Sequence, residues 1–476
     1  MSDSSAQTAL IVLAAGKGSR MKSAVPKQLH PVAGVPMVLR VLRAGLGAEP
    51  DVIALVVSPE TRGVVAEAEA QMPLPVLPVV QDPPRGTGEA TRLALEALPP
   101  VRHAVVAFSD NPLLEPKFMA DLLARAKATC ALVTILTAKV EDAAHYGRIE
   151  RSATGDVVAV IEKANDDEDK RTGKDLQINS GIMVLDGPWA LETLQALPPN
   201  PVNGEFYLTD LITAAVATAR PGQPWPVQTV NAEITAALGV NDRMELAVAE
   251  TQAWARKRRA LMQAGVTMRL PDTIIIDEDV EIGPDSVILP QTMLLGRTRI
   301  GANAVIGPGA VITDSTLGDH VIVRSSTLTG VEIGDGSDVG PYAHLRGGAK
   351  IGAGVHIGNF AEIKASELDT GVKVGHFSYL GDAHIGAGTN VGAGTITANY
   401  DGVNKHRTEI GEHVFLGSDT ILRAPVTLGD HARTGAGSVV TKDVPAGATV
   451  VGVPARAIRR GHPADNSELE HTDKEG

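Results

Sequence analysis

The sequence predicts an α/β domain with a mostly parallel, Rossmann-like sheet, followed by a parallel β-helix of hexapeptide repeats. In the second half, from about Ile282 to about Ala446, an aliphatic residue returns every six positions, often followed by glycine. Six residues fit one flat side of a coil made of short parallel strands. In the first half, short apolar strands alternate with helical stretches, which is typical of a parallel sheet. An ordinary all-β domain would instead need alternating strands and hairpin turns.

Composition limits the kind of protein. The chain has 476 residues, 43% of them hydrophobic, but no apolar run long enough to span a membrane, so no membrane insertion is expected. The first residues lack the features of a signal peptide, and a single cysteine, Cys130, suits the reducing cytoplasm. The net charge of −13 argues against a nucleic-acid-binding body but permits small anionic ligands, which local cations can hold.

The chain is long enough for two domains joined by a helix. The Arg-rich end of that helix, Arg256 to Arg259, can be read as a nucleic-acid contact, but a solvated helix face is the better interpretation. The expected boundaries are 1–243 for the α/β domain, 244–264 for the linker, 265–460 for the β-helix and 461–476 for a disordered tail.

The first strand leads into a cationic glycine turn. Residues 9–13 are apolar, and they run into Ala14-Ala15-Gly16-Lys17-Gly18-Ser19-Arg20-Met21, with Pro26-Lys27 soon after. Backbone N–H groups in such a turn bind anions, and Lys17, Arg20 and Lys27 add positive charge. The spacing matches neither a P-loop nor the fingerprint of dinucleotide binders. A plain structural turn needs no cations, so the three together favour a triphosphate site.

Further strands are expected at 52–58, 76–80 and 103–108, with a helix near 87–98. Gln81 after the third strand leads into Gly86-Thr87-Gly88, which suits the edge of a flat base. Asp110 stands at the tip of the fourth strand, where a cation bridging phosphates prefers an oxygen ligand. An Asp ahead of Asn111-Pro112 is equally well explained as a helix cap.

The glycine turn with Pro26-Lys27 resembles the signature of sugar-phosphate nucleotidyltransferases. Together with the six-residue repeats, the resemblance narrows to the bifunctional N-acetylglucosamine-1-phosphate uridyltransferase/glucosamine-1-phosphate N-acetyltransferase family and covers nearly the whole chain. It implies a left-handed β-helix and two reactions: acetyl transfer from acetyl-CoA to glucosamine 1-phosphate, then uridylyl transfer from UTP to N-acetylglucosamine 1-phosphate with release of pyrophosphate. The product, UDP-N-acetylglucosamine, serves peptidoglycan and lipopolysaccharide synthesis.

The resemblance assigns the substrate contacts of the first domain. Those toward the nucleotide fall on Leu13, Ala14, Ala15, Gly16, Arg20, Lys27, Gln81, Gly86, Thr87, Phe108, Ser109 and Asp110. Those toward the sugar phosphate fall on Gly147, Glu162, Asn179 and Asn241, and Asp110 and Asn241 would share Mg²⁺. Phe108-Ser109-Asp110 departs from the family's common Tyr-Gly-Asp but keeps the Asp. Since the phosphate nucleophile is already ionised, the reaction needs alignment and charge neutralisation more than a strong base.

The β-helix carries a second set of candidate residues where polar side chains interrupt its inward aliphatic pattern. Its six-residue register also breaks at 397–408, which predicts a projecting loop. The resemblance selects His376 as the general base for acetyl transfer, a role that suits histidine because its unperturbed pKa is about 6.5. It assigns the sugar phosphate to Arg346, Lys364, Tyr379 and Asn390. It assigns acetyl-CoA to Ala393, Asn399, Tyr400, Ser418 and Ala436, with Arg456 in place of an arginine that the family has before Val453-Pro454. Homotrimers are implied by the family alone.

Three functional hypotheses compete. The first is the bifunctional enzyme. The second is a nucleotidyltransferase whose β-helix only assembles subunits or binds an effector, and the His376, Arg346 and Lys364 set argues against it. The third is a non-catalytic scaffold of the same two folds, as in some translation-factor subunits, and the intact Lys27 and Asp110 argue against that. Release of free thiol and of pyrophosphate, assayed in parallel, distinguishes them.

Overall fold

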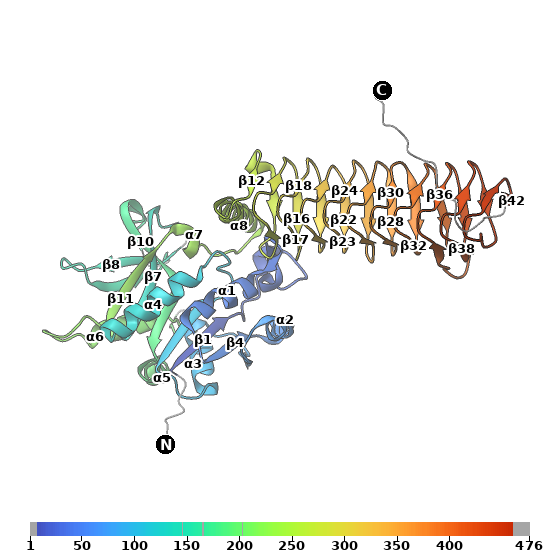
Figure 1. Cartoon of the computed structure of the whole chain (residues 1–476). Coiled ribbons are helices and arrows are strands. Elements are labelled where there is room, and N and C mark those ends of the chain that lie inside the picture. The colour runs from blue at the N-terminus through green and yellow to red at the C-terminus, as the bar shows by residue number, and fades with distance from the viewer. Residues whose placement is uncertain (1–6, 145, 164–165, 202, 460–476) are drawn as a thin grey trace, which may run out of the picture. The chain divides into compact units, whose positions relative to one another are not determined.

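The structure, a computed structural model, describes residues 7–459 except 145, 164–165 and 202 (Figure 1). The chain forms two compact units, Met1–Ala253 and Trp254–Gly476, and helix α8 (Arg243–Gln263) contains the boundary between them. The tail predicted to be disordered, 461–476, lies outside the described residues. Among the described residues, no helix combines the length and the apolar character that crossing a membrane requires.

The first unit is built on one mostly parallel sheet. The central path runs in the order β11-β7-β10-β6-β1-β4-β5, and β8 and β9 extend it beside β10. Strand β10 is antiparallel to both β6 and β7, whereas β1 is parallel to β4 and β6. The strands are β1 (Thr8–Leu13), β4 (Val52–Val57), β5 (Val76–Val80), β6 (His103–Phe108), β7 (Val133–Asp142), β8 (Arg148–Arg151), β9 (Val157–Ile161), β10 (Thr172–Asp186) and β11 (Val227–Ala232). A small hairpin joins β2 (Pro31–Val32) to β3 (Val35–Pro36).

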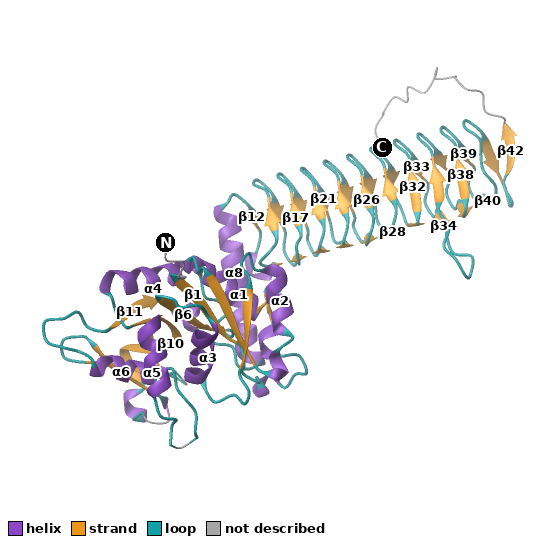
Figure 2. Ribbon diagram, turned by 90° about the horizontal axis from the view of Figure 1, so that it is seen from below, coloured by secondary structure: helices purple, strands orange, loops and turns teal. Residues whose placement is uncertain are grey.

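Helices cover both faces of this sheet, as Figure 2 shows. Alternate residues of β1 point to opposite faces, so Leu10 and Val12 belong to one apolar cluster and Ala9 and Ile11 to another. The first cluster includes α1 (Met37–Gly45), α2 (Val64–Gln71) and α4 (Pro116–Thr129). The second includes α3 (Thr87–Ala97), α5 (Gly187–Ala196) and α6 (Asp210–Ala217), and a short α7 spans Ile234–Ala237. Strands buried on both sides explain the near-continuous apolar runs in the sequence.

The second unit is the left-handed parallel β-helix, with three sheets that we call faces 1, 2 and 3. Face 1 runs from β12 (Thr267–Met268) to β41 (Thr449–Val451) and ends with the antiparallel β42 (Arg456–Arg459). Face 2 runs from β13 (Ile275–Ile276) to β40 (Val439–Val440), and face 3 from β14 (Glu281–Ile282) to β38 (Val426–Leu428). Each strand pairs with the strand one coil along, as when Ile282 pairs with Ile300.

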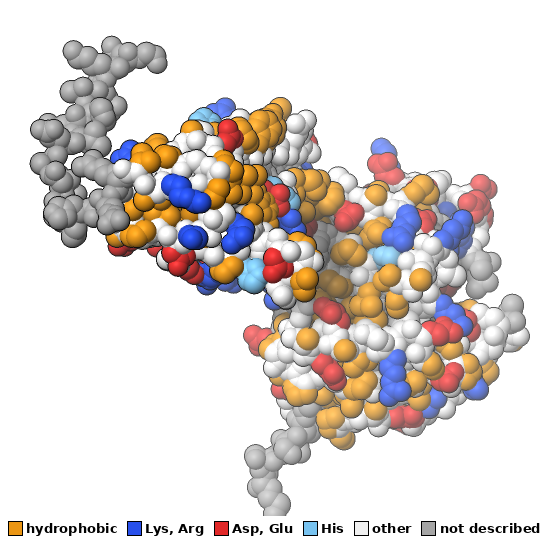
Figure 3. All heavy atoms as spheres, turned by 90° about the vertical axis from the view of Figure 1, so that its right-hand side faces the viewer, with side chains coloured by type: hydrophobic (Ala, Val, Ile, Leu, Met, Phe, Trp, Pro, Cys, Tyr) orange, Lys and Arg blue, Asp and Glu red, His pale blue; other side chains and the backbone are white. Residues whose placement is uncertain are grey.

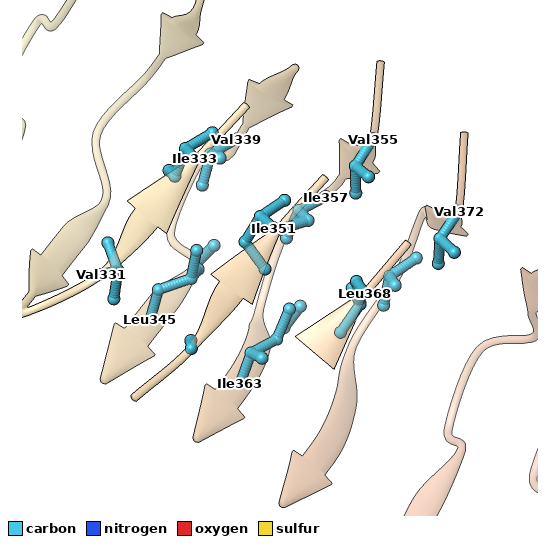
Figure 4. Packing of buried hydrophobic residues seen from close by; sticks show 14 of the residues in the cluster. Val331, Ile333, Val339, Leu345, Ile351, Val355, Ile357, Ile363, Leu368 and Val372 are labelled. Atoms are coloured by element: carbon cyan, nitrogen blue, oxygen red, sulfur yellow. The ribbon is translucent and has the colours of Figure 1, made fainter. Parts of the chain in front are cut away.

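The repeated aliphatic residues fill the centre of the coil. Ile333, Ile351 and Leu368 occupy the same position in successive coils, and each side chain points inward onto its neighbours (Figure 4). Every coil is held by backbone pairing and by this stack of side chains, so each coil contributes a similar amount to the stability of the β-helix. The six-residue period in the sequence therefore arises from one continuous apolar core.

The inward stack predicts a large stability cost for one truncated side chain. Ile351→Ala should lower the free energy of unfolding of the β-helix by about 2–5 kcal/mol, because it removes buried methyl groups and leaves a cavity. Chemical denaturation followed by circular dichroism measures this. Lys350→Ala, one residue earlier and pointing outward, is the matched control and should change stability by no more than about 0.5 kcal/mol. Equal effects of the two variants would contradict the assignment of Ile351 to the core.

Candidate functional sites

In the first unit, in-register pairing places several strand ends at one edge of the sheet. Leu13, the last residue of β1, pairs with Val56 of β4 and with Phe108, the last residue of β6. The backbone N–H of Ser109 donates to the carbonyl of Leu13 at 3.1 Å, so the two chains leave the sheet together. The glycine turn that follows Leu13 and the carboxylate of Asp110 therefore meet at this edge.

The glycine turn is held by a residue that the sequence did not single out. The side-chain amide of Gln28, which is 1% exposed, donates to the carbonyls of Ala14 and Gly16, each at 2.8 Å. Gly18 has φ 62°, and a Cβ atom there would lie 2.5 Å from Cβ of Lys27. That position requires glycine both for its backbone conformation and for the close approach of Lys27.

Lys27 brings together the two residues expected to share a metal. It begins the 3₁₀ helix Lys27–Leu29 and is 9% exposed. Its ammonium group lies 2.5 Å from Oδ2 of Asp110 and 3.3 Å from Oδ1 of Asn241. A carboxylate and an amide oxygen that already converge on one cation form a donor set of the kind Mg²⁺ prefers, so these residues fit the expected metal.

The other two cations of the turn lie elsewhere. Lys17 pairs with Glu60 at 2.9 Å on the surface, and Arg20 is exposed in the 3₁₀ helix Ser19–Met21. Neither lines the pocket at the strand ends. Lys27 is thus the one member of the predicted trio that the fold buries beside Asp110.

The pocket at the strand ends, about 250 Å³, is lined by most of the residues expected to bind the nucleotide. Ala14, also expected to bind the nucleotide, is 1% exposed and does not line this pocket. The buried amide of Gln81 donates to the carbonyl of Gly86 at 2.9 Å and to Glu89 at 3.0 Å, which fixes the entry to α3. From the expected set, Leu13, Ala15, Gly16, Lys27, Gln81, Gly86, Thr87, Phe108, Ser109 and Asp110 line the pocket, joined by Gln28 and Glu205.

A second pocket of about 820 Å³ shares Thr87 and Phe108 with the first, and is lined by Gly147, Glu162 and Asn179. The backbone N–H of Asn179 donates to the carbonyl of Gly147 at 2.9 Å, which joins the two sides of this pocket. Burial raises the pKa of Glu162, while a hydrogen bond with Thr209 and the charge of Arg171 act in the opposite direction.

In the β-helix, cationic side chains collect where strands of face 2 end. Arg346 ends β25 (His344–Arg346) and pairs in register with Lys364, which ends β28 (Ala361–Lys364). Arg346 also donates to Glu362 at 2.8 Å. A hydrogen bond with Lys405 and the charge of that residue lower the pKa of Lys364, and Arg346 adds to the effect. Like charges gathered at one strand end suit a multiply charged anion.

Polar side chains surround this cationic group. The hydroxyl of Tyr379, from β31 (Ser378–Gly381), and the amide of Asn399 both lie over Gly381, where any Cβ atom would collide with them. The Asn399 amide donates to Asp382 at 2.5 Å. Glu362 and Asp382 were missed in the sequence, because acidic residues on a β-helix surface carry no distinguishing pattern.

The loop predicted from the register break is a hairpin. Strand β34 (Ile396–Ala398) precedes it and β35 (Thr408–Ile410) follows it, and Tyr400 pairs with Lys405 across it. Asp401 accepts hydrogen bonds from Val403 and Asn404 N–H groups and pairs with His406, and these contacts lower the pKa of Asp401. Lys405, which meets Lys364, is therefore carried by an internally bonded loop.

The remaining expected residues lie mostly along one corner of the coil. His376 is exposed in the turn between β30 (Lys373–Val374) and β31. Backbone bonds connect this turn to the turns of the following coils, from Gly394 N–H to Phe377, Asp419 N–H to Ala393, and Gly437 N–H to Ser418, at 2.6–2.8 Å. Ala393, Ser418 and Ala436 thus continue the column that begins at His376. Asn390 lies half-buried in β33 (Asn390–Val391), and Arg456 is exposed at the start of β42.

Comparison with known proteins gave two family models. Residues 10–173 match the MobA-like NTP transferase domain, and residues 279–314, 330–365 and 407–442 match the bacterial transferase hexapeptide, six repeats.

Relatives that match almost the whole chain were also found, and the three described here carry the name Bifunctional protein GlmU. One from Streptococcus pyogenes serotype M12 (strain MGAS9429) is 40% identical over 456 residues, covering 95% of this chain and 96% of the relative. One from Stutzerimonas stutzeri (strain A1501) is 40% identical over 453 residues, covering 93% and 96%. One from Paracoccus denitrificans (strain Pd 1222) is 40% identical over 454 residues, covering 95% of each.

Proposed function

This chain belongs to the family of bifunctional GlmU proteins, and on that premise we propose how its two units divide the synthesis of UDP-N-acetylglucosamine. The β-helix transfers the acetyl group of acetyl-CoA to glucosamine 1-phosphate. The first unit then transfers the uridylyl group of UTP to N-acetylglucosamine 1-phosphate and releases pyrophosphate. We propose a cytoplasmic location, because both reactions use metabolites of the cytoplasm. The product would supply precursors for peptidoglycan and lipopolysaccharide.

One observation carries the uridylyltransferase assignment: Lys27 is buried at the edge where two pockets meet, bonded to Asp110 and Asn241. The smaller pocket, with Gln81 and the Gly86 backbone, suits UTP. The larger pocket, with Gly147, Glu162 and Asn179, suits the sugar phosphate. Arg20 is exposed beside the glycine turn and completes the nucleotide contacts when the phosphates are bound.

The chain's own residues supply alignment and charge for this step. The sugar phosphate attacks the α-phosphorus of UTP while the bond to pyrophosphate breaks, so negative charge must be neutralised at both ends. Lys27 provides a buried cation, and Asn179 and Glu162 orient the sugar hydroxyls in the adjoining pocket. Asp110 and Asn241 would hold Mg²⁺, which when bound neutralises phosphate charge.

For acetyl transfer, Arg346, Lys364 and Lys405 bind the phosphate of glucosamine 1-phosphate, and Tyr379 and Asn390 orient the sugar. His376 takes a proton from the sugar ammonium, and the free amine then attacks the thioester carbonyl and expels the CoA thiolate. The turns holding Ala393, Ser418 and Ala436 form a continuous corner along which acetyl-CoA can lie. Asn399, Tyr400 and Arg456 complete its contacts.

The surface of the β-helix supports a homotrimer. Face 3 presents charged residues outward, among them Glu281, Arg299, Glu332, Lys350 and Glu367. The first coils of faces 1 and 2 instead present aliphatic residues outward: Val287, Val305 and Ile322, and Ile275, Met293 and Val311. Figure 3 shows hydrophobic side chains in a band along the visible side of the β-helix. Apolar surface of this extent suits burial against another copy.

The corner between faces 1 and 2 adds an aromatic column that we assign to the same interface. Aromatic residues make up 3% of the chain, yet Tyr342, Phe360 and Phe377 follow one another in successive coils and are 62%, 61% and 56% exposed. Tyr342 and Phe360 stack at 5.6 Å and both have positive φ, a conformation unfavourable for bulky residues. A partner copy covering this column would also enclose His376, which is otherwise open to solvent.

The first prediction from this proposed function separates the two reactions. His376→Ala should reduce CoA thiol release from acetyl-CoA and glucosamine 1-phosphate by about 100-fold or more, because the amine loses its base. It should leave pyrophosphate release from UTP and N-acetylglucosamine 1-phosphate unchanged. Lys27→Met should do the reverse. If either variant, while folded, loses both signals, the assignment of one reaction to each unit fails.

The second prediction concerns pH. Lys405 lowers the pKa of Lys364, so Lys364 loses its proton at a lower pH than an ordinary lysine, and the KM for glucosamine 1-phosphate should rise as the solution becomes alkaline. Lys405→Met removes the neighbouring charge and raises the pKa of Lys364, which should move this rise in KM to higher pH. Lys350→Met on face 3 should keep the wild-type profile. An identical profile for all three proteins would rule out coupling between Lys364 and Lys405.

The third prediction concerns assembly. Tyr342→Ser with Phe360→Ser should convert the trimer to monomers in light scattering coupled to size-exclusion chromatography, because it removes the apolar contact at the corner. Thiol release should fall with the trimer while pyrophosphate release persists. Glu332→Ser on the charged face 3 is the control and should stay trimeric. A wild-type protein that is monomeric at micromolar concentration would contradict the proposal directly.

A further inference from the structure

A buried arginine lies behind the larger pocket of the first unit. Arg171 is 2% exposed and heads the largest fully buried side chains of the described residues. It follows the 3₁₀ helix Glu168–Lys170 and precedes β10, the strand that carries Asn179. Burying a guanidinium group is costly unless its donors are all occupied, so its contacts indicate what the fold uses it for.

The guanidinium group of Arg171 contacts one carboxylate and one loop. It donates to Asp166 at 2.9 Å and to the carbonyls of Ala144 and Tyr146, each at 2.9 Å. Arg148, the first residue of β8, holds the same carboxylate with two hydrogen bonds of 3.0 and 2.7 Å. The Arg148 hydrogen bonds and the charges of both arginines lower the pKa of Asp166, which keeps it ionised although it is buried.

These contacts lead to the walls of the sugar-phosphate pocket. The two carbonyls come just before Gly147 in the sequence, and Asp166 comes four residues after Glu162; Gly147 and Glu162 both line this pocket. The hydroxyl of Tyr146 also accepts the N–H of Gly239 at 2.9 Å, two residues before Asn241. The charge of Arg171 further opposes the burial that raises the pKa of Glu162.

We propose that Arg171 is a positioning residue for uridylyl transfer: its guanidinium group holds the carbonyls of Ala144 and Tyr146, next to Gly147, and the carboxylate of Asp166 in the geometry that receives the sugar phosphate. The proposal rests on the function assigned above to this unit. A purely structural role accounts less well for the arrangement. Two guanidinium groups share one carboxylate, which leaves an excess of buried positive charge, and two further donors of Arg171 bind carbonyls that lie beside one pocket wall.

Arg171→Lys tests the proposal because it keeps the charge beside Asp166 and Glu162 but cannot reach both carbonyls at once. We expect it to raise the KM for N-acetylglucosamine 1-phosphate by about tenfold or more, because the loop is misplaced, and to leave the KM for UTP within about twofold. Acetyl transfer by the β-helix should be unchanged. Arg171→Gln, which also removes the charge, should in addition move the acidic limb of the pH profile upward, because Glu162 then binds a proton more readily.

The control is Arg151→Gln. Arg151 lies on β8, the strand that also carries Arg148, and it makes hydrogen bonds to Gln177 and to the carbonyl of Gly155. Unlike Arg171, it is exposed, and it lines neither pocket. Its KM values should equal those of the wild type. The proposal is overturned if Arg171→Lys, with a wild-type circular-dichroism spectrum, keeps the wild-type KM for the sugar phosphate. It is also overturned if the only effect is a fall in apparent kcat that matches the loss of folded protein, with both KM values unchanged. Absence of pyrophosphate release from the wild type would instead refute the proposed function.

Discussion

Both units depend on one constraint, the in-register pairing of parallel strands. In the first unit it sets the ends of β1 and β6 side by side, so a glycine turn and a carboxylate that are far apart in the sequence leave the sheet at one edge. In the β-helix it sets equivalent positions of successive coils in columns, so that Arg346 lies beside Lys364 and the turn of His376 begins a row of similar turns. Backbone pairing thus decides which side chains can act together.

The two sites handle anions in different ways within an acidic protein. The first unit buries a single cation, Lys27, among oxygen atoms, where low solvent access strengthens its interactions. The β-helix gathers several cations on an open face, where the charges of Lys364 and Lys405 repel each other. A net charge of −13 is compatible with both, because each ligand meets local charge rather than the charge of the whole molecule.

Much of the architecture was predictable from the sequence because it depends on periodic patterns. The six-residue period predicted the β-helix, and its break at 397–408 predicted a projecting loop, which the structure shows to be a hairpin. The four strands predicted in the first unit, β1, β4, β5 and β6, lie within a residue or two of their expected bounds, whereas β7 to β11 were not predicted. The direction in which a side chain points was harder to predict. Lys17 and Lys27 look alike in the turn, yet one pairs with Glu60 on the surface and the other with Asp110.

The residues that support the sites were the hardest to predict. Gln28, Arg171 and Asp382 act through contacts with backbone carbonyls or with residues brought near by folding, and none belongs to a local motif. A glutamine, an arginine or an aspartate in a loop is most often a surface residue, so their burial and partners become known only from the fold. The site residues themselves came from family resemblance, and the structure adds which of them share a pocket.

The two hydrogen bonds from Gln28 to the glycine turn have a thermodynamic consequence. Glycine-rich segments lose more conformational entropy on ordering than any others. If the turn became ordered only when a ligand bound, this entropy loss would weaken the binding of the ligand. Since Gln28 immobilises the turn in the free protein, this entropy is already lost during folding. On the function proposed above, binding of a triphosphate would therefore lose little further entropy in ordering this turn.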